Sequence, residues 1–170
     1  MSSWIFPLKN HSLAVPSEDW HPGKFGFKRK FDYHHTGVDL YAKEGDPTLA
    51  VEDGTIIAIE NFTGPMNNTP WWNDTWAVLV EGASGVVVYG EILPLLNPGN
   101  SVVQGQTIGT VLTVLKELVV KDWIPGHSRS MLHLELHQPG TTGTAWWKLG
   151  EVQPPTLLDP TSLLINSTRS

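Results

Sequence analysis

Short segments rich in β-branched and aromatic residues recur along the chain, and this succession limits the possible fold more than any other feature. Turn sequences such as Gly45-Asp46-Pro47, Glu52-Asp53-Gly54 and Asn97-Pro98-Gly99-Asn100 separate the segments. Strands separated by turns in this way predict a mainly β, antiparallel fold. The predicted strands comprise residues 33–41, 48–51, 54–60, 76–81, 85–91, 106–115 and 131–137.

No helix competes with this interpretation. The best helical candidate, residues 111–121, is dominated by β-branched side chains, which favour strands. A chain of 170 residues, 40% of them hydrophobic, has the size of one domain with its own core. We expect the C-terminal tail, residues 141–170, to pack along the sheet. Residues 1–170 are therefore predicted to form a single domain, an antiparallel β-sheet or sandwich.

Composition excludes several classes of function. The formal net charge is −6, and the lysines and arginines are scattered, so the chain has no basic surface for nucleic acid. The chain has no cysteine, so a metal could be held only by imidazole and carboxylate groups. We expect a soluble chain, because we find neither a signal peptide nor an apolar segment long enough to span a bilayer. The compartment and the oligomeric state stay open.

Two clusters of metal-ligating residue types have strand spacing. His35 and Asp39 are four residues apart in a segment that looks extended, so their side chains are expected on one face. His133, Glu135 and His137 alternate with leucines and are also expected on one face of a strand. His137 is two steps beyond His133, roughly 13 Å away at the rise of a strand, and is too distant to share its metal. The two clusters form one site only if their faces meet.

Two long segments interrupt the regular strands. Residues 61–75 connect two strands that a short hairpin could join, and they contain the pair Trp71-Trp72. Residues 115–130 lead directly into the second histidine cluster and contain His127. Loops of such length commonly bind a ligand, and both are candidates for the walls of a substrate groove. Trp71 and Trp72 would then contact a sugar or peptide, although paired tryptophans are more often anchors of a loop.

Several short motifs follow one another along roughly residues 25–137. They are His35-x-x-x-Asp39, Gly45-x-Pro47, Ala50-x-x-x-Gly54, Val87-Val88-Tyr89-Gly90, Val103-x-x-Gly105-Gln106-x-Ile108-Gly109 and Leu132-His133-Leu134-Glu135. Their order resembles the lysostaphin-type (LytM-domain) zinc endopeptidases. This resemblance implies a metallopeptidase-like antiparallel β core with a groove. It also implies a zinc ion held by His35, Asp39 and His133.

The sequence departs from the family pattern at both catalytic imidazoles. The family's Tyr-x-His motif reads Tyr89-Gly90-Glu91 here, so a glutamate replaces one histidine. The first histidine of the family's His-x-His motif falls on Met131, which can neither donate a hydrogen bond nor accept a proton. All three implied metal ligands are present, whereas both implied catalytic histidines are absent.

The remaining residues still support a hydrolytic mechanism. Two histidines and one carboxylate leave an open coordination position on zinc for water, as in catalytic sites. A carboxylate can act as the base that the reaction also needs, and we assign this role to Glu91 as a hypothesis. His127 is the best candidate for polarising the scissile carbonyl, with His34 and His137 as weaker ones. Met131 and Glu135 are expected to line the groove.

Each assignment has a plainer alternative. His35, Asp39 and His133 could form a hydrogen-bonded cluster without metal. Glu91 could be a carboxylate on the surface or a partner of a ligand histidine. His127 could be an ordinary loop residue, and Glu135 could orient a ligand instead of meeting substrate.

Three functions follow from these patterns. The first is a zinc metallopeptidase that cleaves an amide bond, with peptidoglycan as the substrate implied by the resemblance alone. The second is a zinc-containing but inactive relative that uses its groove for binding. The third is a structural module of the same fold. The open zinc site favours the enzyme, because structural zinc sites usually have four protein ligands. The two missing imidazoles weigh against it, because each positioned acid–base group contributes about 10²–10⁴-fold to rate.

Overall fold

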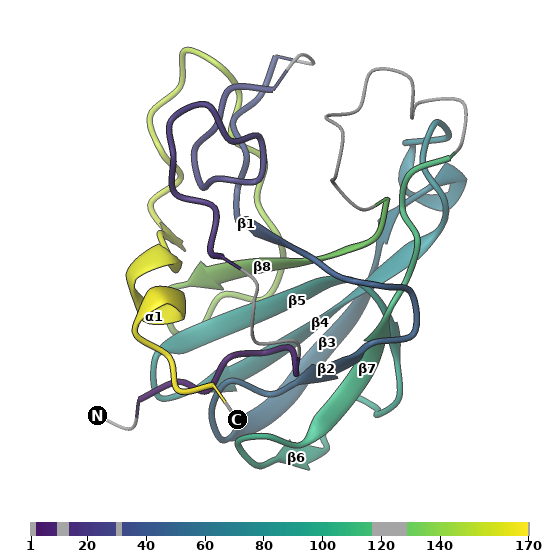
Figure 1. Ribbon diagram of the computed structural model, residues 1–170, viewed down its shortest axis with the longest axis vertical. Helices are drawn as coiled ribbons and strands as arrows, with labels where there is room; N and C mark the ends of the chain where they lie inside the picture. Colours follow the sequence, from purple (N-terminus) through teal and green to yellow (C-terminus); the bar gives the residue numbers. More distant parts are fainter. Residues whose placement is uncertain (1–2, 10–13, 30–31, 117–128, 170) are drawn as a thin grey trace.

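The structure is a computed structural model that describes residues 3–9, 14–29, 32–116 and 129–169. Its strands form one sheet in the order β1-β8-β5-β4-β3-β6, with β7 joining β2 to β5 and β9 extending β8 (Figure 1). Every pair of these strands is antiparallel, which confirms the predicted mainly β, antiparallel fold. The strands are β1 (Val38–Tyr41), β2 (Pro47–Leu49), β3 (Gly54–Thr63), β4 (Thr75–Gly82), β5 (Gly85–Pro94), β6 (Ser101–Val102), β7 (Thr107–Val111), β8 (Met131–His137) and β9 (Leu157–Leu158).

The central strands β4 and β5 are buried on both faces, and their alternating side chains serve two apolar clusters. Val78 and Val80 belong to the main core, together with Tyr89 from β5. Their neighbours Ala77 and Leu79 point the other way into a smaller cluster, which Phe62 covers in part. The period of two along each strand therefore separates two packed layers, one on each face of β4 and β5.

The predicted strand 33–41 is too long at its beginning, because β1 starts only at Val38. Upstream of Gly37 the backbone bonds to a neighbouring loop instead of the sheet, with the His35 amide donating to the carbonyl of Phe27 at 2.8 Å. Predicted strand 131–137 coincides with β8, and 85–91 extends to Pro94 in β5. Predicted strand 106–115 is shorter in the structure, because β7 ends at Val111.

The tail returns to the sheet through elements that the strand pattern missed. β9 pairs with the end of β8, with Leu158 opposite Leu136 and Leu157 opposite His137. The short helix α1 (Thr161–Ile165) follows and buries Leu164 in the core, and a 3₁₀ turn (η1, Pro65–Asn67) lies within the first long loop. In Figure 1, α1 lies beside β8 at the edge of the sheet. In the part of the chain that the structure describes, no helix meets the length and hydropathy needed to cross a membrane.

At Gly37 the chain entering β1 passes close to β8, and this contact gives a first prediction. A Cβ atom at position 37 would lie 2.9 Å from Nε2 of His133 and closer still to the carbonyl oxygen of Leu134. We expect Gly37→Ala to lower the free energy of unfolding by about 1–3 kcal/mol, because the backbone cannot move aside without strain. Urea denaturation followed by tryptophan fluorescence measures the change.

Gly143→Ala is the matched control, since a Cβ there would meet only Oε1 of Glu60 at an ordinary 3.5 Å. Equal urea midpoints for the two variants would contradict the tight approach of β1 and β8 at Gly37.

Candidate metal centre

The pairing of β1 with β8 brings the two predicted clusters together. Asp39 lies directly opposite His133 in the antiparallel register, so their side chains share one face at short range. His35 approaches the same point from the segment just before β1. All three side chains are buried, with 4–5% of each residue exposed. The faces of the two clusters therefore meet, as the spacing requires for a shared site.

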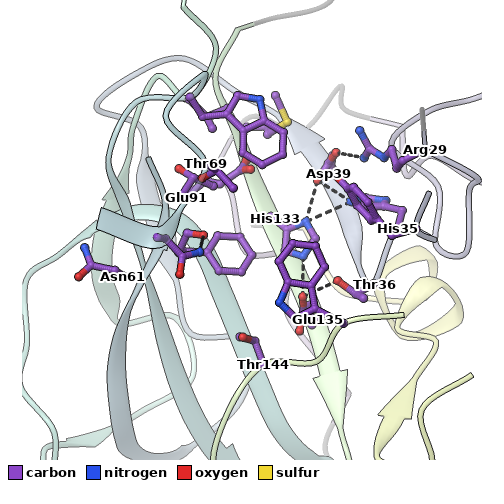
Figure 2. A pocket seen from close by; sticks show the side chains of 18 of the residues that line it. Arg29, His35, Thr36, Asp39, Asn61, Thr69, Glu91, His133, Glu135 and Thr144 are labelled. Carbon is purple, nitrogen blue, oxygen red and sulfur yellow. Dashed lines mark hydrogen bonds and ion pairs between the residues drawn. The ribbon is translucent and has the colours of Figure 1, made fainter. Parts of the chain in front are cut away.

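Three ligand atoms converge on one point (Figure 2). Nε2 of His35 lies 3.0 Å from Oδ1 of Asp39 and 3.1 Å from Nδ1 of His133, and these last two atoms are 3.0 Å apart. In a tetrahedral zinc site with bonds of about 2.0–2.1 Å, neighbouring ligand atoms are about 3.3 Å apart. The triangle is thus close to one face of a zinc tetrahedron, and these residues fit the ion that the family resemblance implies.

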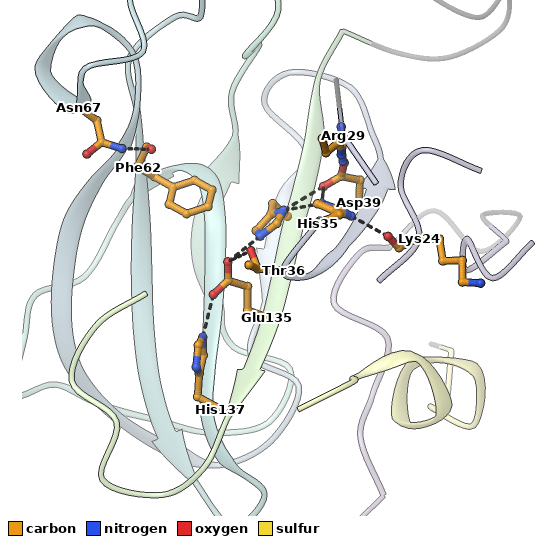
Figure 3. A network of polar contacts seen from close by, with 10 residues as sticks. Lys24, Arg29, His35, Thr36, Asp39, Phe62, Asn67, Glu135 and His137 are labelled. Carbon is orange, nitrogen blue, oxygen red and sulfur yellow. Dashed lines mark hydrogen bonds and ion pairs between the residues drawn. The ribbon is translucent and has the colours of Figure 1, made fainter. Parts of the chain in front are cut away.

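Hydrogen bonds on the far side of each imidazole fix which nitrogen faces this point (Figure 3). Nδ1 of His35 donates to the carbonyl oxygen of Lys24 at 2.9 Å. Nε2 of His133 donates to Oε1 of Glu135 at 2.9 Å, as Figure 2 shows. In neutral rings the inner nitrogens then carry lone pairs. Two lone pairs and a carboxylate oxygen, buried within 3.1 Å of one another, repel unless a proton or a cation lies between them.

The pKa values of the two histidines reflect the repulsion between these three groups. Burial lowers the pKa of His35 to about 4. Burial alone would also lower the pKa of His133, but hydrogen bonds with Asp39 and Glu135 raise it to about 10. The pKa of Asp39 is held well below its ordinary value by the two histidines and Arg29, against the effect of burial. Without metal at neutral pH, one proton on His133 therefore occupies the place of a cation.

Glu135 and His137 continue the polar chain away from the centre (Figure 3). Glu135 accepts hydrogen bonds from His133, from His137 at 2.8 Å and from Thr36 at 2.7 Å. Burial would raise the pKa of Glu135, but the bonds from the two histidines lower it to about 2. These bonds fix the orientation of the His133 ring.

Glu91 reaches the site because the backbone of β5 is irregular at that residue. Between the pairs Val78–Tyr89 and Trp76–Ile92, β5 contains one residue more than β4, and Glu91 has a positive φ of 65°. This conformation costs a residue with a Cβ atom about 1–2 kcal/mol. The bulge turns the carboxyl group toward the cavity that His35, Asp39 and His133 line. Strained backbone of this kind is a common feature of functional sites.

The Glu91 carboxyl is buried, with 8% of the residue exposed. Its Oε2 atom has no hydrogen-bond partner in the described part of the chain. Burial, together with the charge of Asp39, raises the pKa of Glu91 to about 8. A buried carboxyl that holds its proton near neutral pH has the acid–base character that catalysis requires.

The cavity beside these residues has a volume of about 210 Å³. Of the residues predicted for a substrate groove, Trp72, Met131 and Glu135 are among those that line this cavity, whereas Trp71 is not and is 45% exposed. Trp146 and Tyr33 form an unpredicted part of the wall, with ring centroids 5.6 Å apart.

Other predicted residues have different outcomes. His127 lies outside the described residues. His34 stacks on Trp147 with ring centroids 4.4 Å apart, and His137 is fully buried against Glu135, so neither lines the cavity to polarise a carbonyl. Sequence reasoning missed Arg29, which donates to Oδ2 of Asp39 at 2.9 Å. Arg29 belongs to a loop without periodicity, where no spacing could have indicated its position.

Comparison with known proteins supports the same family. Residues 33–144 match the model of "Peptidase family M23". A search of curated proteins found no match. The fold is similar to a zinc-containing peptidase from Vibrio cholerae, with a TM-score of 0.51 and 18% identity over 79% of this chain. The chain spans only 36% of the length of that protein.

Two solved catalytic domains match over most of both chains. One is a single-residue variant of the prophage-encoded M23 protein EnpA from Enterococcus faecalis, with a TM-score of 0.50, 20% identity, and coverage of 92% of this chain and 95% of that one. The other is the antimicrobial peptidase lysostaphin from Staphylococcus simulans, with a TM-score of 0.50, 17% identity, and coverage of 86% and 90%. At 17–20% sequence identity, these similarities show a shared fold and nothing finer.

The triangle of ligand atoms predicts one zinc ion per chain. We expect His133→Ala to abolish stoichiometric zinc binding, because it removes one of three ligands. His34→Ala is the matched control, since that ring stacks on Trp147 and bonds to the carbonyl of Gly26, away from the triangle. Zinc content after dialysis, measured by atomic emission, tests the site. Full zinc content in His133→Ala would rule out the assigned ligand set.

Zinc binding should also release a proton. Below its pKa of about 10, His133 is protonated in the metal-free protein, and zinc must displace that proton. We therefore expect release of about one proton per zinc, and an affinity that rises about tenfold per pH unit in the neutral range. Calorimetry in buffers of different ionisation enthalpy measures the number released. Release of no proton at neutral pH would show that the cluster is neutral without metal.

Proposed function

This chain belongs to peptidase family M23, and from that premise we propose that it is a zinc-dependent amide hydrolase with Glu91 as its general base. One observation carries the proposal. The converging atoms of His35, Asp39 and His133 share a cavity with the buried Glu91 carboxyl group, whose Oε2 has no hydrogen-bond partner among the described residues. A purely structural role does not explain why these buried polar groups line a cavity.

The ligand residues would supply the metal chemistry. A zinc ion held by His35, Asp39 and His133 would act as a Lewis acid and lower the pKa of water to about 7. Glu135 keeps the ring of His133 oriented through the bond to Nε2, and the carbonyl of Lys24 does the same for His35. These two outer contacts leave the inner nitrogens free for a metal.

Glu91 would move the proton. As the oxygen of water forms a bond to the carbonyl carbon of the substrate, the Glu91 carboxylate accepts a proton from that water. When the carbon–nitrogen bond breaks, Glu91 passes this proton to the leaving nitrogen. A pKa of about 8 suits both steps, because the group can accept and donate a proton near neutral pH.

The substrate class follows from the family and from the wall of the cavity. The resemblance of this chain to lysostaphin-type enzymes supports the peptide cross-bridges of peptidoglycan as the substrate. Trp72 and Trp146 offer flat apolar surfaces at the cavity, and Trp146 is 67% exposed. Such rings can pack against an extended peptide or a sugar.

Met131 favours a second candidate, a zinc-containing module that binds peptide without cleaving it. Met131 lines the cavity at the position where the resemblance implies a catalytic histidine, and its thioether cannot donate a hydrogen bond to substrate. Retention of peptidoglycan without any cleavage, in the presence of bound zinc, would support this candidate instead of the enzyme.

The assigned base gives a direct prediction. We expect Glu91→Gln to lower the rate of peptide cleavage by about 10²–10⁴-fold, because the amide cannot accept the proton. Zinc content should stay at one per chain, since Glu91 is not among the three ligands. The measurement is the release of new amino groups from purified peptidoglycan and from short peptides, with products identified by mass spectrometry.

Glu44→Gln, which makes the same change at an exposed position, is the control and should keep the wild-type rate. Unchanged cleavage by Glu91→Gln would exclude the assigned base while leaving the metal site intact.

A further inference from the structure

Arg29 is a partly buried cation that lines the cavity and has no role in the reaction proposed above. Its Nη2 atom donates to Oδ2 of Asp39 at 2.9 Å, and its side chain retains 26% exposure. Its Nε atom is buried and has no hydrogen-bond partner in the described part of the chain. A buried donor without a partner is costly, and this one belongs to a residue that lines the cavity.

The contacts of Asp39 fix where Arg29 lies. Oδ1 of Asp39 faces the two histidines, while Oδ2 accepts from Arg29. The Asp39 carboxylate therefore lies between the guanidinium and the proposed metal site. Figure 2 shows Arg29 beside Asp39 on one side of the ligand cluster, with Glu91 on the other.

The charge of the cavity makes this position unusual. Among the described residues that line it, Arg29 is the only arginine or lysine, whereas Asp39, Glu60, Glu91 and Glu135 carry carboxyl groups. A guanidinium keeps its charge at all ordinary pH values and offers five donors in a fixed plane. One donor is used on Asp39, and Nε has no partner among the described residues, so the guanidinium can still donate hydrogen bonds to a further anionic partner.

We propose that Arg29 is a catalytic residue that stabilises the negative charge on the substrate's carbonyl oxygen during hydrolysis. This inference rests on the proposed function. As the oxygen of water bonds to the carbonyl carbon, the π electrons of the carbonyl move onto its oxygen, and Arg29 binds the resulting charge. When the carbon–nitrogen bond breaks, the carbonyl re-forms and the charge leaves the oxygen. Arg29 keeps all its protons throughout.

A plainer role is that Arg29 only neutralises Asp39. If Arg29 only neutralises Asp39, its removal would weaken the binding of the metal and of every ligand of the cavity. If Arg29 stabilises an oxyanion, its removal would weaken the binding of anionic ligands alone. Two uncleavable isosteres of tetra-alanine separate these cases. A phosphinic isostere carries a negative charge on a tetrahedral centre, and a hydroxyethylene isostere has a similar tetrahedral centre without charge.

The experiment compares zinc-loaded wild type with Arg29→Gln, using zinc content and calorimetric affinity for both isosteres. We expect one zinc per chain in each protein and a loss of about 10- to 100-fold in affinity for the phosphinic isostere, as for other hydrogen bonds to charged groups. Affinity for the hydroxyethylene isostere should change less than about twofold. In cleavage assays kcat should fall about 10²–10³-fold with little change in KM.

Lys28→Gln is the matched control, because it removes a charge from the adjacent, exposed residue. Arg29→Lys keeps the charge in another shape, so we expect an intermediate loss of phosphinate affinity, and it provides the test if Arg29→Gln does not fold. An equal loss for both isosteres, or loss of zinc, in either variant would overturn the proposal and assign Arg29 to the support of Asp39.

The same data separate this inference from the proposed function. If wild type cleaves no peptide but its preference for the phosphinic isostere depends on Arg29, the hydrolase assignment fails and the anion-binding role of Arg29 stands. If wild type cleaves peptide and Arg29→Gln keeps both kcat and the phosphinate preference, the hydrolase assignment stands and this inference fails.

Discussion

Three electron pairs directed at one buried point between β1 and β8 are the constraint on which the rest of the site depends. The antiparallel pairing of Asp39 with His133 sets two of them, and the bend at Gly37 brings His35 to the third corner. In water each of these groups would be solvated separately. Inside the protein their mutual repulsion has to be relieved by a proton or a metal ion, so the fold holds a place for a cation before any ion arrives.

Two glutamates near this centre show how the environment sets different roles for one residue type. Glu135 accepts hydrogen bonds at both oxygens, and its pKa of about 2 keeps it ionised. Glu91 has an oxygen without a partner among the described residues, and its pKa is raised to about 8. The first can only orient its neighbours, because it does not take up a proton near neutral pH. The second can exchange a proton with a ligand of the cavity.

The sequence predicted the parts of the site that depend on strand parity. Alternation along 131–137 placed His133, Glu135 and His137 on one face, and the structure joins them in a hydrogen-bonded chain. The alternation of side chains along one strand could not predict the bulge that points Glu91 toward the cavity. A bulge depends on a mismatch in length between two paired strands. Alternation also could not place Arg29 or Trp146, which lie in loops where tertiary contacts alone decide the direction of a side chain.

The charges of the cavity connect the two departures from the family pattern. By resemblance, an imidazole stands where this chain has Glu91, and another where it has Met131. An imidazole can become a cation, whereas a carboxyl group can only become an anion and a thioether stays neutral. The exchange therefore removes positive charge from a site where negative charge must develop on the substrate. Arg29 restores one permanent positive charge, and its bond to Asp39 holds it at the same cavity as Glu91. In the proposed mechanism, proton transfer and charge stabilisation, which two imidazoles would share, are divided between a carboxyl group and a guanidinium.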